Sequence, residues 1–150
     1  MPIVSFSFDK IIADRKKQKL EVPLKAKTSI KITEIKEEEL TLAGGRKDLL
    51  LRFFFEYFVD YQTDQASILL AGNVLFSGKR EELEKIYKEW KKTKKFSPEV
   101  SKDVLNHVFV RCNIKALSFE QEVNIPPHIV LPRLTPVAPG KKNKAEDYIG

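Results

Sequence analysis

The feature that most constrains this chain is the alternation of large apolar side chains over Leu49–Tyr61. Every odd position of that stretch is large and apolar, whereas Arg52, Glu56 and Asp60 fall on even positions. Because successive side chains of a strand point to opposite faces, the pattern predicts a β-strand with one fully apolar face. A strand of about 13 residues, rising roughly 3.3 Å per residue, is longer than most strands.

Three further segments have the period of a strand. Ser29–Leu42 carries apolar residues with a phase slip near Ile35, which predicts a strand with a bulge. Ala66–Ser77 follows the long strand after a short polar turn, and near the start of the chain Phe6 and Phe8 alternate with serines. The segments predict an antiparallel β-meander.

The hydrophobic period then becomes helical. The segment 79–95 carries one apolar stripe on an otherwise charged helix, with Ser77 or Gly78 as the expected N-cap. A second helix is predicted to start at Ser97, which places a hydroxyl at the cap and Pro98 at the first helical position. The stripe residues of the first helix are Leu83, Ile86, Tyr87 and Trp90.

Strands first and helices after predict an α+β fold, with two helices packed on one face of an antiparallel sheet. The length of 150 residues suits one domain, which we expect over residues 1–134. The remaining residues, 135–150, are basic and rich in proline and are expected to form a flexible C-terminal tail.

Composition limits the classes of protein that this chain can belong to. Lys and Arg total 27 against 21 acidic residues, a net charge of +6 that suits either nucleic-acid binding or solubility. The excess of Lys over Arg and of Glu over Asp is typical of thermophile proteins. No apolar run approaches the roughly 20 residues of a membrane span, and no secretion signal is seen. The single cysteine, Cys112, fits a cytoplasmic protein.

No motif of enzymatic chemistry is complete. The stretch 72–80 resembles a phosphate loop, but its glycine spacing is one residue too long and Arg80 replaces the hydroxyl that would hold magnesium. His107 and His128 have no Cys or His at metal-ligand spacing. Glu56 is embedded among aromatic residues but shares its strand face with other charges. We therefore expect no enzyme activity, no metal and no cofactor.

The long strand has more apolar residues than one face can hold. Leu50, Phe54 and Phe58 lie on its second face, which the two helices cannot also cover. Those aromatic side chains stay exposed unless a ligand or another subunit covers them, as burial in a dimer interface would.

A nucleic-acid-binding domain is an alternative interpretation, because single-strand binders interleave basic and aromatic residues. Tyr87 and Trp90, however, share the stripe that should be buried, so the neighbouring lysines are more simply a solvated face. A protein-interaction scaffold also remains open. The residues that nucleic-acid binding would use are Lys88, Lys91, Lys92 and Lys95.

In this order, the segments resemble the SecB family of protein-export chaperones. The stretch 6–11 resembles the opening strand of that family, and Leu49–Tyr61 followed by Ala66–Ser77 resembles its long meander. Residues 106–132 resemble its long helix and the extended segment with prolines that closes the domain. SecB itself is strongly acidic and has an acidic tail that contacts the export motor, whereas this chain is basic.

The resemblance implies a homo-oligomer, a dimer or tetramer, that holds unfolded or extended polypeptide clients in apolar grooves without catalysis. It leaves open whether such a protein serves export, a toxin–antitoxin system or another role. Binding would be weak at each groove and strengthened by several grooves on one oligomer. The candidate client-binding residues are Phe54, Phe58, Leu75 and Trp90.

Overall fold

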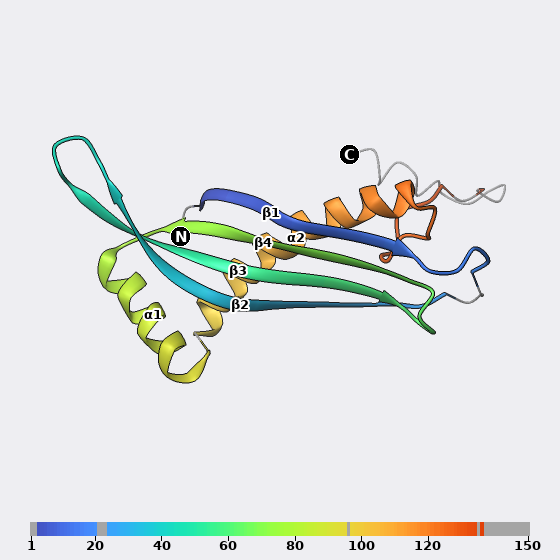
Figure 1. The fold of residues 1–150 in the computed structure, drawn as a ribbon, viewed down its shortest axis with the longest axis horizontal. Helices are drawn as coiled ribbons and strands as arrows, with labels where there is room; N and C mark the ends of the chain where they lie inside the picture. Colours follow the sequence, from blue (N-terminus) through green and yellow to red (C-terminus); the bar gives the residue numbers. More distant parts are fainter. Residues whose placement is uncertain (1–2, 21–23, 96, 135, 137–150) are drawn as a thin grey trace.

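The computed structural model describes residues 3–20, 24–95, 97–134 and 136. It contains a four-stranded antiparallel sheet followed by two helices, which confirms the predicted α+β arrangement (Figure 1). The tail expected over 135–150 lies outside the described residues, apart from Pro136. The strands are β1 (Ile3–Arg15), β2 (Ala26–Thr41), β3 (Lys47–Tyr61) and β4 (Ala66–Ser77).

The strand order across the sheet is β1-β4-β3-β2. Strands β2, β3 and β4 form the expected meander, but β1 pairs with β4, so the chain between β1 and β2 joins the two edges of the sheet (Figure 1). Gly72 of β4 makes this pairing possible, because a Cβ there would lie 2.2 Å from the carbonyl oxygen of Ser7. The predicted bulge of β2 falls between Ile32 and Glu34.

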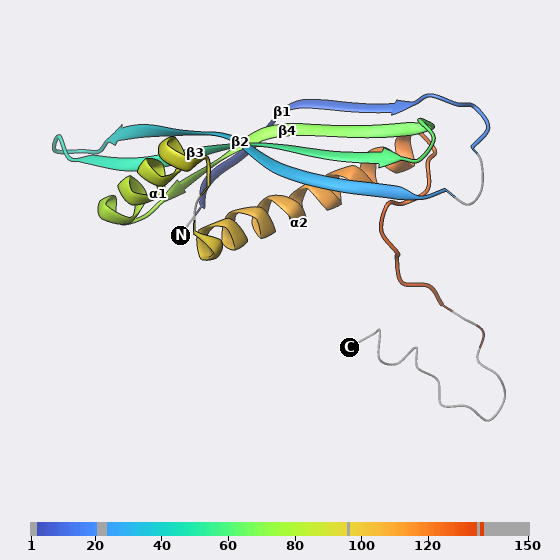
Figure 2. The same ribbon diagram turned by 90° about the horizontal axis from the view of Figure 1, so that it is seen from below.

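Both helices, α1 (Arg80–Thr93) and α2 (Pro98–Glu122), lie on the same face of the sheet (Figure 2). α2 starts as predicted, since the Ser97 hydroxyl accepts a hydrogen bond from the Val100 N–H at 3.4 Å. The expected cap of α1 is wrong: its N-cap is Lys79, which makes no side-chain cap hydrogen bond. The turn after β4 is one residue longer than the sequence pattern suggests.

The core lies between the sheet and the helices. The odd residues of β3, from Leu49 to Tyr61, are all buried there, as the alternation predicts. Leu83, Ile86 and Trp90 of α1 and Cys112 of α2 pack into the same core. The helices therefore cover the face of β3 that carries the odd residues, whereas the even residues of β3 lie on the opposite face of the sheet.

Candidate functional site

The sheet face opposite the helices, which we call the open face, carries a row of apolar side chains. Strand register aligns Ile12 of β1 with Leu69 of β4, and Leu69 with Phe58 of β3. The neighbouring residues Tyr57 and Val59 are fully buried, whereas Phe58 is 37% exposed and Ile12 is 42% exposed. Because α1 and α2 both lie on the other side of the sheet (Figure 2), the apolar row of Ile12, Leu69 and Phe58 is left uncovered by either helix.

Further along the open face, the side chains become polar. Arg52 forms a two-pronged ion pair with Glu38, at 2.8 and 2.9 Å, and also donates a hydrogen bond to Asn73. The hydrogen bonds from Arg52 hold the pKa of the Glu38 carboxyl below its usual range. Asn73 in turn donates to Asp9 of β1 at 2.8 Å. The open face is thus divided into an apolar part and a network of charges.

The structure brings three of the four predicted client-binding residues onto the open face. Phe58 belongs to the apolar row, and Phe54 is half-buried beneath Lys36, whose Nζ lies 5.3 Å from the ring centre. Leu75 is on the same face by register but is only 7% exposed. Trp90 lies on the opposite side, 7% exposed, because its stripe on α1 packs under the sheet.

The lysines of the nucleic-acid alternative do not form an uninterrupted cationic surface. Lys88 and Lys92 line a shallow hollow on α1 together with three glutamates. The Lys91 Nζ lies 5.0 Å from the centre of the Tyr87 ring, and Lys95 follows the end of the helix. The glutamates of the hollow are Glu81, Glu84 and Glu89.

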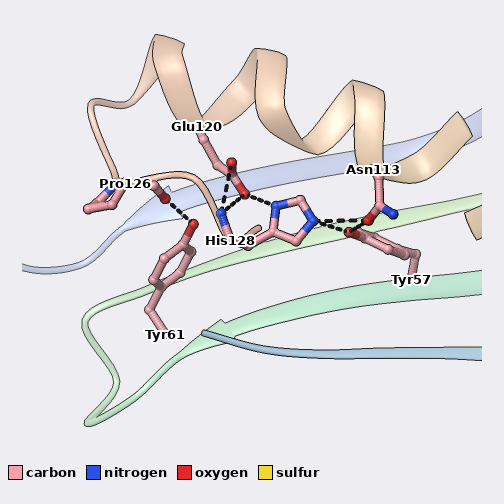
Figure 3. Close-up of polar contacts among 6 residues, drawn as sticks. All are labelled: Tyr57, Tyr61, Asn113, Glu120, Pro126 and His128. Carbon is pink, nitrogen blue, oxygen red and sulfur yellow. Dashed lines mark hydrogen bonds and ion pairs between the residues drawn. The ribbon is translucent and has the colours of Figure 1, made fainter. Parts of the chain in front are cut away.

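A buried polar network after α2 was not predicted from the sequence. The chain leaves the helix with Asn124 at a φ of 56° and continues as an extended segment, residues 125–134. There the His128 Nδ1 contacts the Glu120 carboxylate, and both side chains are almost fully buried (Figure 3). The His128 N–H also donates to that carboxylate, at 3.3 Å. The Glu120 carboxylate therefore holds both the imidazole ring and the backbone N–H of His128 in place.

The other ring nitrogen of His128 meets two side chains of the domain (Figure 3). Nε2 lies 2.8 Å from the Tyr57 hydroxyl and 2.9 Å from Asn113 Oδ1. The Tyr57 hydroxyl donates to the same Oδ1 at 2.6 Å. An amide oxygen cannot donate, so the Nε2–Oδ1 contact is a hydrogen bond only when Nε2 carries a proton. Contacts with Glu120 on one side and with Tyr57 and Asn113 on the other thus engage both ring nitrogens of His128.

The network holds the extended segment against the domain through hydrogen bonds. Burial raises the pKa values of Tyr57 and Tyr61, so both phenols stay protonated and act as hydrogen-bond donors. Tyr61 donates to the carbonyl of Pro126 (Figure 3), and Arg15 donates to the carbonyl of Asn124 at 2.7 Å. Hydrogen bonds at Asn124, Pro126 and His128 thus hold the end of the α2 turn and the start of the extended segment to the sheet.

The outer side of this segment is apolar and accessible. A cleft of ≈ 570 Å³ lies between residues 126–133 and the start of β2, where Leu24 and Ala26 line it. Ile129 and Leu131 are 39% and 43% exposed, and Val130 is almost entirely exposed. The structure therefore adds a second accessible apolar surface to the apolar row.

Two further titratable groups are explained by packing. Burial raises the pKa of the Cys112 thiol to about 12, which makes it a protonated, inert core side chain. Burial and the nearby Arg111 lower the pKa of His107, whose Nε2 is buried without a hydrogen-bond partner. Among the described residues, no three His, Cys, Asp or Glu side chains are grouped to bind a metal ion.

No helix in the described part of the chain is long and apolar enough to cross a membrane. No family model matches the chain, and comparisons with curated proteins and with solved structures gave no match.

Proposed function

We propose that this protein is a non-enzymatic, SecB-like holdase that binds unfolded or extended polypeptide segments in the cytoplasm. The observation that carries the proposal is the apolar row, in which Ile12 and Phe58 are accessible on the sheet face opposite α1 and α2. Monomeric proteins rarely leave large contiguous apolar patches uncovered, and such patches mark sites of interaction. An extended segment needs a long, shallow apolar surface of this kind rather than a closed pocket.

The energetics favour many weak contacts over one tight site. Covering the exposed 37% of Phe58 removes about 75 Å² from water, if the side chain presents about 200 Å² in total. At about 25 cal/mol per Å², that burial stabilises the complex by about 2 kcal/mol. A homo-oligomer, a dimer or tetramer, would present several copies of the row and of the cleft beside residues 126–133 to one client, which multiplies the affinity.

The proposal is tested by suppression of the aggregation of an unfolded client, followed by light scattering. Phe58→Ser should weaken suppression several-fold while leaving the circular dichroism spectrum and the melting temperature nearly unchanged. Leu42→Ser is the matched control, because Leu42 is also 37% exposed but directly follows the end of β2, away from the row. We expect the control to behave like the unmodified protein.

Two outcomes would contradict this assignment. Equal losses in Phe58→Ser and Leu42→Ser would mean that no particular surface binds the client. If Phe58→Ser unfolds the protein, Ile12→Ser serves as the second variant, since Ile12 is 42% exposed on an edge strand. If Ile12→Ser and a folded Phe58 variant both suppress client aggregation as well as the unmodified protein does, the apolar row does not bind the client.

A further inference from the structure

A second cleft lies where the end of α1 and the start of α2 meet the edge strand β2. Its volume is ≈ 290 Å³, near the lower end of the range of ligand pockets, so it has room for one or two side chains of an extended chain. Its apolar lining comes from three elements, and its polar lining is mostly lysine. The residues are Ile32, Trp90 and Leu105, then Lys31, Lys94, Lys95 and Ser101.

The charge of this cleft is positive and poorly neutralised. Lys31 pairs with Glu56 at 3.3 Å, but both side chains are well exposed, so the pair is weak. Neither Lys94 nor Lys95 forms an ion pair with any residue that the structure describes. The N-terminus of α2, at Ser97, lies beside Lys95 in a neighbouring hollow that Glu89 also lines.

A lysine at the end of a helix has an ordinary explanation, because cations stabilise the negative end of the dipole. Lys31 lines the rim of the cleft from β2, but its ammonium group pairs with Glu56 on the open face and does not point into the cleft. One feature goes beyond the dipole explanation. Lys94 adopts a left-handed conformation with a φ of 58°, at a position where glycine is usual and a lysine is strained.

The lining favours a polypeptide over a nucleic acid. Single-stranded nucleic acids stack their bases on exposed aromatic faces. Here Trp90 is only 7% exposed, and the Nζ of Lys94 lies 5.5 Å from the centre of its ring. The cleft offers an apolar floor for one side chain and cationic groups for the carboxylates beside it.

We propose that this cleft binds acidic segments of extended polypeptides, in which an apolar side chain is flanked by Asp or Glu. The apolar side chain contacts Ile32, Trp90 and Leu105, and the flanking carboxylates pair with Lys94 and Lys95. The inference rests on the proposed holdase function and specifies the clients that such a holdase selects. It also accounts for part of the net charge of +6.

Trp90 is the only tryptophan of the chain, so its fluorescence reports directly on the cleft. Three tryptophan-free peptides of equal length are titrated into the full chain, with a central leucine flanked by glutamates, glutamines or lysines. We expect a saturable change in Trp90 emission with the glutamate peptide. Its Kd should be roughly tenfold lower than that of the glutamine peptide and should rise with salt, because exposed charges are screened.

Two double variants separate the cleft from the overall charge. Lys94→Gln with Lys95→Gln should weaken binding of the glutamate peptide to the level of the glutamine peptide. Lys88→Gln with Lys92→Gln removes the same charge from the shallow hollow on α1 and should leave the Kd unchanged. All four substitutions are of exposed side chains, and melting curves confirm that both variants are folded.

Equal affinity for the glutamate and glutamine peptides, or equal losses in the two double variants, would overturn the inference. A single-stranded oligonucleotide that produces the same Trp90 change at lower concentration would also overturn it. These failures differ from failure of the holdase proposal. If the holdase proposal fails, no client is protected from aggregation. If only the cleft proposal fails, clients are still protected but acidic clients are not preferred.

Discussion

A single glutamate links the helical part of this protein to its C-terminal segment. The Glu120 carboxylate is 1% exposed and accepts hydrogen bonds from both the ring and the backbone of His128. Such a pair is costly to bury, and removing one partner leaves the other without compensation, which typically costs 3–5 kcal/mol. Replacing both partners with apolar groups costs less than the two single losses combined, since neither side chain is then left without its partner and only the His128 backbone N–H loses its acceptor.

At the scale of the residue, this difference predicts coupling between Glu120 and His128. Glu120→Leu and His128→Leu should each lower the free energy of unfolding by about 3 kcal/mol. The double variant should lose clearly less than the sum of the two single losses. Urea unfolding of the three variants and the unmodified protein measures the coupling. Strictly additive losses would show that the contact does not stabilise the fold.

At the scale of the element, the two helices start differently. Ser97 caps α2 through its hydroxyl, whereas Lys79 caps α1 without a side-chain hydrogen bond and places a cation at the positive end of the helix dipole. The stability of α1 therefore depends more on Leu83, Ile86 and Trp90 packing under the sheet than on its own first turn.

We predict opposite effects for exchanges at the two caps. Ser97→Ala should lower the free energy of unfolding by about 1 kcal/mol, and Lys79→Ser should raise it by up to about 1 kcal/mol. Ser118→Ala, which removes an exposed hydroxyl inside α2, is the control and should have little effect. Thermal melts followed by circular dichroism measure all three. A loss of stability in Lys79→Ser would contradict this account of the α1 start.

At the scale of the whole molecule, apolar side chains remain exposed on both sides. Val110 and Ile114 of α2 are 57% and 65% exposed on the helical side, while Ile12 and Phe58 are exposed on the open face. The proposed holdase would use one side for contact with another subunit and the other side for a client.

Mass in solution distinguishes these arrangements. We predict that light scattering gives a dimer or tetramer and that an apolar dye still binds to it, because assembly on one side leaves the other accessible. Phe58→Ser should reduce the dye signal without changing the mass. A monomer that binds no dye would contradict both the oligomer and the holdase proposal.

The long strands and both helices follow from local pattern, because alternation and the helical stripe are properties of neighbouring residues. The buried odd positions of β3 and the Ser97 cap are therefore found where the sequence predicts them. The open-face position of Phe54 and Phe58 follows from the same alternation. The burial of Leu75, which is only 7% exposed, does not follow from the alternation, because it depends on neighbouring side chains from other strands.

The sequence by itself determined which segments become strands and helices and which face of β3 enters the core, because each follows from the period of nearby side chains. Only the tertiary structure decided that β1 joins β4, that Trp90 faces away from Phe58, and that Glu120 and Tyr57 meet at His128. The contact between Tyr57 and His128 joins residues 71 positions apart in the chain. Such contacts depend on how packed elements fit together, and no local pattern carries that information.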